Sequence, residues 1–480
     1  MITIANYIGG VWTPPRSGRY FDDINPATGE VMARVPDSDA ADVEAAVSAA
    51  RAAWPAWRSM KPAQRYEALH ALAEGIRRRL DELAALESDD NGKPLWLARS
   101  VDIPRAVSNF SFYAAAALHF GSESYEMGDE VLSYVLRRPL GVVGAISPWN
   151  LPLYLFTWKI APALAAGNCV VAKPSEVTPL TAFELSRIAQ EVGFPAGVLN
   201  IVHGRGASAG EAVVMHPHTR AVSFTGGTRT GRRIAELAAR QFKKVSLELG
   251  GKNPNIIFAD APYDEALRTT VRSSFANQGQ ICLCGSRILV EASIYERFRD
   301  DLVERARALK VGDPRDPDTR VGAVVSESHM QKILSYIALA REEGGRILTG
   351  GERVAVPGRC KDGFFVAPTV IEGLAPTCRV NQEEIFGPVV TLIPFADEEE
   401  ALSIANGVEY GLSATVWTQD LRRAHRMARD LEAGIVWINT WLLRDLRTPF
   451  GGTKASGMGR EGGWEAMLFF TEPKAVTIQL

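Results

Sequence analysis

The chain has 480 residues, of which 46% are hydrophobic and 23% charged, and its formal net charge is -3. At this length we expect two or three domains, because single hydrophobic cores stop growing at about 250–300 residues. The balanced charge provides no basic surface for a nucleic acid and no Lys/Arg run for an anionic membrane, so we expect a small-molecule partner.

Cysteine usage and the N-terminus favour a cytoplasmic location. The cysteines form no CxxC pair and lie near no His pair, so we expect neither a disulfide framework nor a metal site. We expect no signal peptide or transmembrane helix, since the most apolar segment, residues 141–156, is interrupted by Pro, Trp and Asn. The five cysteines are Cys169, Cys282, Cys284, Cys360 and Cys378.

The first hundred residues predict a short β region followed by helices. Turn residues precede an alternating strand within residues 24–35, and an Ala-rich segment at 39–54 has apolar residues at helical spacing. From about residue 140, short apolar strands at 141–147, 168–175 and 197–204 alternate with amphipathic helices. This alternation is typical of β-α units, so we expect a doubly wound α/β domain.

The alternation resumes after residue 250, which indicates a second α/β domain. It predicts strands at 253–258 and 286–291 and a helix at 264–277. Two strand-like segments, 129–139 and 474–480, lie outside both repeats. Strands at such positions often pair with another subunit or domain, which favours an oligomer.

Two residues at strand–loop junctions carry candidate chemistry. Cys282 lies in a Gly- and Gln-containing loop, where it and Cys284 could also be small buried hydrophobes; a disulfide between them would be strained. Glu248 ends an apolar strand, so we expect it to be exposed at the carboxyl edge of a sheet, where ligands bind. Together they suggest a nucleophile and a general base.

Over essentially its whole length, the chain resembles the aldehyde dehydrogenase family. The segments LELGGKNP and GQICLCGSR, which contain Glu248 and Cys282, are similar to the signature pair of that family. SPWNLPL, AKPSE, FTGG, EEIFGPV and PFGGTKASGMGRE also match. The resemblance implies an α/β, aldehyde dehydrogenase-like fold, with a Rossmann-type cofactor domain, a second α/β catalytic domain and a small β oligomerisation arm.

The resemblance also implies a division of the chain. Residues 1–118 and 140–248 would form the NAD-binding domain, and residues 249–452 the catalytic domain. Residues 119–139 and 453–480 would form oligomerisation or bridging segments. Since members of the family are dimers or tetramers, we expect a homodimer or homotetramer.

Four residues would perform the chemistry that the resemblance implies. The Cys282 thiolate would attack the aldehyde carbon, hydride would pass to NAD, and Glu248 would activate the water that hydrolyses the thioester. The Asn150 side chain and the Cys282 N–H would stabilise the oxyanion, although Asn150 could also simply form a turn. Glu461 resembles a second glutamate used in a proton relay by some members, or it is an exposed charge in a Gly-rich loop.

The resemblance places NAD along several turns and strand ends. Glu176 would accept hydrogen bonds from the adenosine ribose and repel a 2′-phosphate, which favours NAD over NADP. The Gly-rich turns do not fit GxGxxG, and Gly227 stands where members often have Ser. The full set of cofactor residues is Trp149, Lys173, Glu176, Gly206, Gly210, Phe224, Gly226, Gly227, Glu384 and Phe386.

Three arginines, Arg105, Arg444 and Arg447, indicate an acidic aldehyde, because guanidinium binds carboxylate at two points. The alternative is that they face solvent, where Asp445 is an available ion-pair partner. The segments IPR, WLLRDLR and SSFANQGQICLC resemble those of one branch of the family, the 2-aminomuconate and 2-hydroxymuconate 6-semialdehyde dehydrogenases. Enzymes of that branch act in aromatic-ring degradation. That branch implies that Arg105 and Arg444 grip the substrate carboxylate, and Trp158 joins the substrate site.

Three other functions remain open at this point. A betaine- or amino-aldehyde dehydrogenase would use Trp441 in a cation box, beside which arginines are unfavourable. A CoA-acylating enzyme would generally lack Glu248. A catalytically silent structural member would not need the intact set of Cys282, Glu248 and Asn150.

Overall fold

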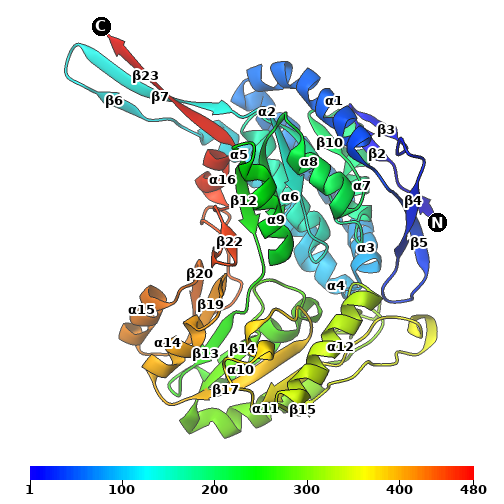
Figure 1. The fold of residues 1–480 in the computed structure, drawn as a ribbon, viewed down its shortest axis with the longest axis vertical. Coiled ribbons are helices and arrows are strands. Elements are labelled where there is room, and N and C mark those ends of the chain that lie inside the picture. The colour runs from blue at the N-terminus through cyan, green and yellow to red at the C-terminus, as the bar shows by residue number, and fades with distance from the viewer.

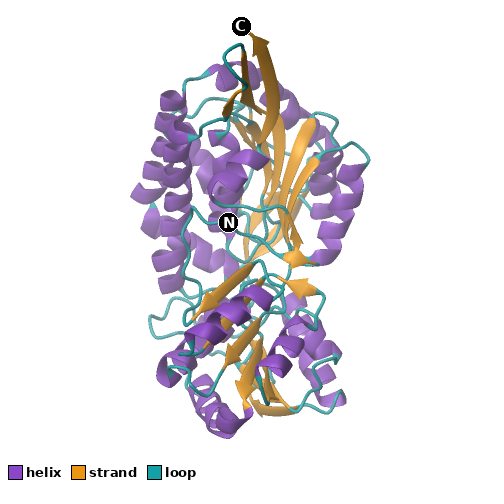
Figure 2. Ribbon diagram, turned by 90° about the vertical axis from the view of Figure 1, so that its left-hand side faces the viewer, coloured by secondary structure: helices purple, strands orange, loops and turns teal.

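The computed structural model describes residues 1–480. Two α/β domains, each built on one large sheet, form its body and lie one above the other along the long axis (Figure 1). Helices lie on both sides of these sheets (Figure 2). A narrow third sheet extends from the upper domain and carries the C-terminus at its tip (Figure 1). The predicted arrangement of two α/β domains with a small β arm is therefore confirmed.

The upper sheet has eight strands, of which the five central ones are parallel. Their order is β22 (Gly457–Met458), β12 (Lys244–Glu248), β11 (Thr219–Thr225), β8 (Val142–Ile146), β9 (Cys169–Lys173), β10 (Leu199–Ile201), β2 (Asn6–Ile8) and β3 (Val11–Thr13). The three strands predicted after residue 140 are β8, β9 and β10, and all are completely buried, as expected for parallel strands covered on both faces.

The helices of the upper domain include the one predicted at 39–54, which is α1 (Ala40–Ser59). It begins at Asp39, whose side chain accepts a hydrogen bond from the Ala41 N–H. α6 (Pro152–Ala165) is buried along its whole length and packs on β8 and β9, so its first turn is firmly placed. The others are α2 (Pro62–Arg78), α3 (Leu80–Asn91), α4 (Leu95–Leu97), α5 (Ile103–His119), α7 (Leu180–Glu191), α8 (Glu211–Met215) and α9 (Thr228–Ala239).

The lower sheet has seven strands, and only its edge strand β15 is antiparallel. Their order is β15 (Arg346–Thr349), β16 (Thr369–Glu372), β17 (Val389–Phe395), β14 (Arg287–Glu291), β13 (Pro254–Ile257), β19 (Ser413–Trp417) and β20 (Ile435–Ile438). The strands predicted at 253–258 and 286–291 are β13 and β14. The helices are α10 (Tyr263–Phe275), α11 (Tyr295–Arg307), α12 (Glu327–Glu342), α13 (Arg379–Gln382), α14 (Glu398–Asn406) and α15 (Leu421–Asp430).

The β arm joins the two strand-like segments that lie outside the repeats. β7 (Val131–Pro139) pairs antiparallel with β23 (Thr471–Gln479) over nine residue pairs, and β6 (Ser124–Glu126) pairs with the other edge of β7. The rest of segment 453–480 lies elsewhere, because β22 covers the edge of β12 and α16 (Gly463–Phe469) packs on α6. Only the last strand of that segment belongs to the arm.

A small sheet near the N-terminus completes the upper domain. It has the order β1 (Ile2–Thr3), β5 (Val31–Pro36) and β4 (Tyr20–Ile24), and β5 is the strand predicted within residues 24–35. A two-stranded sheet of β18 (Tyr410–Gly411) and β21 (Thr453–Lys454) connects the lower domain to the C-terminal segment. None of the helices combines the length and apolar character that crossing a bilayer requires.

Candidate active site

A left-handed turn brings Cys282 to the junction of the two domains. The helix predicted at 264–277 ends at Phe275, because Asn277, Gln278 and Gly279 have φ values of 50°, 57° and 70°. Left-handed residues cannot continue a right-handed helix. The Gln278 side chain holds the turn by donating from Nε2 to the Ala323 carbonyl at 2.8 Å. Cys282 then follows in the loop before β14.

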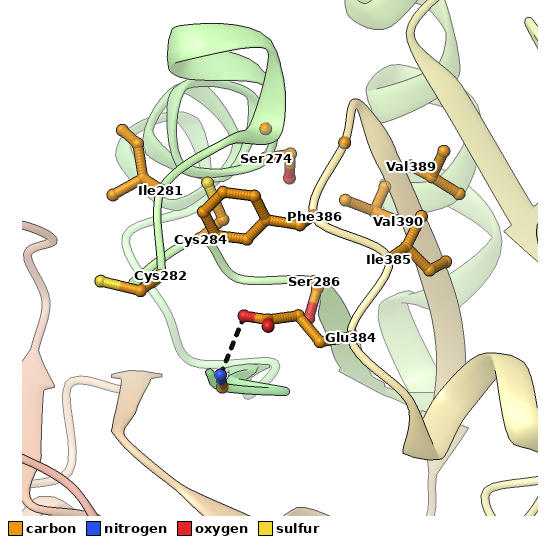
Figure 3. A pocket seen from close by; sticks show the side chains of 13 residues that line it. Ser274, Ile281, Cys282, Cys284, Ser286, Glu384, Ile385, Phe386, Val389 and Val390 are labelled. Carbon is orange, nitrogen blue, oxygen red and sulfur yellow. Dashed lines mark hydrogen bonds between the residues drawn. The ribbon is translucent and has the colours of Figure 1, made fainter. Parts of the chain in front are cut away.

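Two cavities meet at Cys282, beside a third and much smaller one of about 20 Å³ that Cys282 and Cys284 line together (Figure 3). The larger, about 480 Å³, is also lined by Glu248, and the smaller, about 240 Å³, is also lined by Asn150. Figure 3 shows the Cys282 side chain pointing away from Cys284, while Glu384 and Phe386 come from the facing loop. A group in either cavity can therefore reach the Cys282 sulfur, whereas Cys284 lines neither.

The surroundings of Cys282 favour the neutral thiol over the thiolate. Burial raises its pKa well above the ordinary value of a thiol, and the charges of Glu248 and Glu384 raise it further. The guanidinium of Arg444 acts in the opposite direction. All five cysteines are free.

Glu248 ends β12, as predicted, but it is only 4% exposed, so the prediction that it lies exposed at the sheet edge is wrong. β22 covers that edge, and Gly451 packs so closely that a Cβ atom there would lie 2.7 Å from Glu248 Oε1. Neither carboxyl oxygen has a hydrogen-bond partner. Burial raises the pKa of Glu248 well above its ordinary value, and Glu461 raises it further.

Asn150 lies just before α6, and hydrogen bonds fix both its side-chain amide and its backbone carbonyl. Its Nδ2 donates to the Gln280 carbonyl at 2.9 Å, and its own carbonyl accepts hydrogen bonds from Lys93 Nζ at 3.1 Å and Asn277 Nδ2 at 2.9 Å. An amide nitrogen has two hydrogens, so one remains for an oxygen in the smaller cavity.

Glu461 is buried rather than exposed, and it lines the larger cavity together with Glu248. Its Oε1 accepts hydrogen bonds from Lys159 Nζ at 2.8 Å and Ser223 Oγ at 2.7 Å, while Oε2 has no partner. The motif analysis did not identify Lys159. It is the only charged residue of the otherwise apolar α6, and this is a signal from which it could have been found.

The smaller cavity has an aromatic wall and carries several of the predicted cofactor residues. The rings of Trp149 and Phe386 meet edge to face at 5.3 Å, and Glu384 Oε1 accepts a hydrogen bond from the Gly251 N–H at 3.0 Å. Gly226 and Gly227 line the same cavity. His329 and Lys332, which motif reasoning missed, also line it, and Lys332 Nζ donates to the Glu384 carbonyl at 3.0 Å.

The predicted ribose site lies at the carboxyl end of β9. Lys173 Nζ donates to Glu176 Oε2 at 2.8 Å, and the Gly206 N–H donates to Oε1 at 3.2 Å. Gly210 packs against the aliphatic part of Lys173. Phe224 does not line the smaller cavity; its ring lies under Gly226, where a Cβ atom would come within 2.4 Å.

Arg105 and Arg444 both line the larger cavity, and neither forms an ion pair with a side chain of the protein. Arg444 donates to the Tyr154 hydroxyl at 2.9 Å and lies over the rings of Phe450 and Trp158, at 3.9 and 5.1 Å. The Arg105 guanidinium lies 5.5 Å from the centre of the Tyr154 ring.

A third arginine in this cavity, Arg272, was not predicted. It lies over the Trp441 ring and donates to the Trp441 carbonyl at 3.2 Å. Arg447, which was predicted, does not line the cavity; it is exposed at the entrance and pairs with Asp445 at 2.6 Å, in agreement with the alternative, solvent-facing interpretation.

The comparisons with known proteins cover the whole chain. Residues 12–476 match the aldehyde dehydrogenase family. The chain is 52% identical to 2-aminomuconic semialdehyde dehydrogenase of Danio rerio, covering 100% of this chain and 98% of that protein. It is 48% identical to 2-hydroxymuconic semialdehyde dehydrogenase of Pseudomonas sp. (strain CF600), with full coverage of both. A solved indole-3-acetaldehyde dehydrogenase complexed with NAD+ superposes with a TM-score of 0.97 at 41% identity, covering 100% of this chain and 97% of that one.

Proposed function

Since this chain belongs to the aldehyde dehydrogenase family, we propose that it oxidises 2-aminomuconate or 2-hydroxymuconate 6-semialdehyde to the acid with NAD+. The observation that carries this proposal is the presence of Arg105 and Arg444, both without an ion-pair partner, in the cavity that contains Cys282. A half-buried guanidinium without a counter-ion favours an anionic ligand, and a carboxylate fits it at two points. Relatives named for these two substrates are about half identical to the chain.

NAD+ supplies the acceptor for the hydride that leaves the substrate. The smaller cavity fits the nicotinamide end of NAD+, because the rings of Trp149 and Phe386 form an aromatic wall there. Glu384 lines the same cavity, and its carboxylate can accept hydrogen bonds from the nicotinamide ribose. Glu176, with two carboxylate oxygens at the end of β9, would hold the adenosine ribose and repel a 2′-phosphate. This supports NAD rather than NADP.

The residues of this chain divide the reaction into two halves. The Cys282 thiol releases its proton to solvent, its sulfur bonds to the aldehyde carbon, and the oxygen that becomes negative accepts hydrogen bonds from Asn150 Nδ2 and the Cys282 N–H. Loss of the hydride leaves a thioester. Glu248, once ionised, takes a proton from water, whose oxygen attacks the thioester carbon while the C–S bond breaks. The neighbouring Glu461, whose Oε2 has no hydrogen-bond partner, offers the next position for that proton.

The alternatives are less well supported. A cationic betaine or amino aldehyde would enter a cavity with three arginines, and the Trp441 ring already faces Arg272. A CoA-acylating enzyme has no use for the ionisable Glu248 beside Cys282. A silent member would not need the free hydrogen-bonding atoms of Glu248 and Glu461 that face the cavity.

Assembly and location are part of the proposal. The arm exposes apolar side chains, including Tyr125, Leu136 and Ile478, and its outer strands β6 and β23 each have a free edge, which supports a homodimer or homotetramer built through it. A cytoplasmic location is supported by the five free cysteines.

The test compares wild type with Arg105→Ala and Arg444→Ala, following NADH absorbance with freshly generated 2-aminomuconate and 2-hydroxymuconate semialdehydes. Each change removes charged hydrogen bonds of about 1.5–3 kcal/mol and should lower kcat/KM for both substrates roughly 10- to 150-fold. Hexanal, which has no carboxylate, should be little affected.

Arg447→Ala is the matched control, because Arg447 is exposed and paired with Asp445. It should leave all three substrates unchanged. An equal loss on hexanal, or no loss on the semialdehydes, would remove the carboxylate clamp from the proposal.

A further inference from the structure

The backbone of Asn150 is fixed by two donors that come from distant parts of the chain. Lys93, just after α3, and Asn277, in the left-handed turn before Cys282, both donate to the Asn150 carbonyl. The same Asn277 nitrogen also reaches the Gln280 carbonyl at 3.2 Å, which is the acceptor of Asn150 Nδ2. The Asn150 side chain and the loop carrying Cys282 are therefore connected by a closed set of hydrogen bonds.

Lys93 is fully buried, and its side chain has two polar partners. Its ammonium forms an ion pair with Asp102, which is also fully buried, and its other hydrogen bond goes to the Asn150 carbonyl. Its own carbonyl accepts a hydrogen bond from Ser88 Oγ. A buried ion pair gives no clear gain in stability over two well-packed apolar residues. Stability alone therefore does not account for a charge placed here.

Asp102 connects this contact to the substrate cavity. It lines the larger cavity, and it lies one helical turn before Arg105, at the start of α5. Lys93 itself lines neither cavity. The ion pair thus holds the helical turn that carries Arg105 against the backbone of Asn150. Lys93 itself would contact neither the aldehyde substrate nor NAD+.

We infer that Lys93, fixed by Asp102, is a positioning residue that sets the place of the Asn150 amide relative to Cys282, and that Asn277 acts on the same carbonyl from the other side. Small displacements matter here, because an oxyanion donor stabilises charge only where it lies about 2.7–3.1 Å from the developing oxyanion. The inference rests on the proposed role of Asn150 in the active site.

A double-mutant cycle tests this, with the single-turnover burst of NADH formation from hexanal and saturating NAD+ as the readout. Asn150→Ala alone should slow the burst by roughly 10²- to 10³-fold, as expected for the loss of an oxyanion donor. Lys93→Met should slow it on the order of tenfold or more in the wild-type background, with little change in KM for hexanal. In the Asn150→Ala background the same change should have almost no effect, since no amide remains to be placed.

Lys93→Met leaves Asp102 buried without its counter-charge, which by itself can destabilise the fold. Two further variants avoid this problem. Lys93→Met with Asp102→Leu replaces the whole pair by apolar side chains. Asn277→Gly removes the second donor, and glycine readily adopts the φ of 50° found there. Both should slow the burst only where Asn150 is present.

Gln278→Gly is the matched control, since Gln278 has the same left-handed conformation but donates to Ala323. Any slowing that it causes should be the same factor in both backgrounds. If the Lys93 and Asn277 variants also slow both backgrounds by the same factor, their role is structural and the inference is wrong. If Asn150→Ala itself leaves the burst unchanged, the proposed oxyanion role fails instead.

Discussion

Glu248 combines deep burial with two unsatisfied oxygens, and this sets the expected pH dependence of the enzyme. Its pKa is raised well above the ordinary value of 4.5, so the carboxyl group is protonated at low pH and ionises only as the pH rises through the shifted value. Hydrolysis of the thioester needs the ionised form. We expect kcat, measured from pH 5 to 10, to increase with pH, with the midpoint of the increase well above pH 4.5.

Glu248→Gln provides the matching control for that profile. It should lower kcat by roughly 10²- to 10⁴-fold, the range of a lost general base, and abolish the increase with pH. The NADH burst should survive if Glu248 acts on the thioester alone. If kcat of the variant still increases with pH in the same way, the titrating group is not Glu248.

Motifs singled out Cys282, Glu248 and Asn150, which line the two adjoining cavities, but they gave no indication of the surroundings of these residues. The burial of Glu248 depends on β22, which lies more than 200 residues later, so no local pattern contains it. Lys93 likewise reaches Asn150 across 57 residues. Contacts of this length are set by the tertiary fold, and no local sequence pattern contains them.

At the scale of elements, β4 and α3 are joined by a buried pair of acids. Asp23, on β4, is 2% exposed, and Asp90, on α3, is fully buried. Burial raises the pKa of Asp23 to about 7, from an ordinary 3.8, and the pKa of Asp90 is raised well above that value by burial, Asp23 and Glu87. Since the folded state prefers the protonated acids, this pair supports folding fully below pH 4 and loses its contribution as the pH rises through about 7.

Asp23→Asn should therefore stabilise the protein at high pH, because asparagine resembles the protonated acid and does not ionise. We expect a gain of about 2 kcal/mol at pH 8, roughly half of what the full shift in pKa would give, and a smaller effect at pH 5. Urea unfolding at both pH values measures it. Asp313→Asn is the control of opposite sign, since the pKa of Asp313 is lowered by its hydrogen bond to Arg359. A destabilised Asp23→Asn protein at pH 8 would contradict the expectation.

Element types were predictable where an apolar pattern was long and continuous. β8, β9 and β13 are buried along their whole lengths, and each was predicted within one or two residues. The end of α10 was missed because Asn277 and Gln278 adopt left-handed conformations that their residue types do not require. β22 has only two residues, too few for any periodicity.

For the whole molecule, the arm is the feature that should govern assembly. Ile478, on its last strand, is 41% exposed although apolar. Ile478→Arg should reduce the sedimentation coefficient to that of a smaller species, because a charge in an apolar contact is costly. Leu421→Arg is the control, since Leu421 is 71% exposed on α15, away from the arm. A wild type that sediments as a single chain, or an unaffected Ile478→Arg protein, would contradict assembly through the arm.

The route of the chain also has a consequence for its synthesis. β12, which ends in Glu248, pairs with β22, and the base therefore lacks its cover until residue 458 has been made. At about 5–20 residues per second, the ribosome needs roughly 10 to 40 s to travel from β12 to β22. Throughout that interval, the nascent upper domain has an open edge at β12, and β7 is paired with β6 but not yet with β23. The active site is thus completed only when the final segment of the chain has been made.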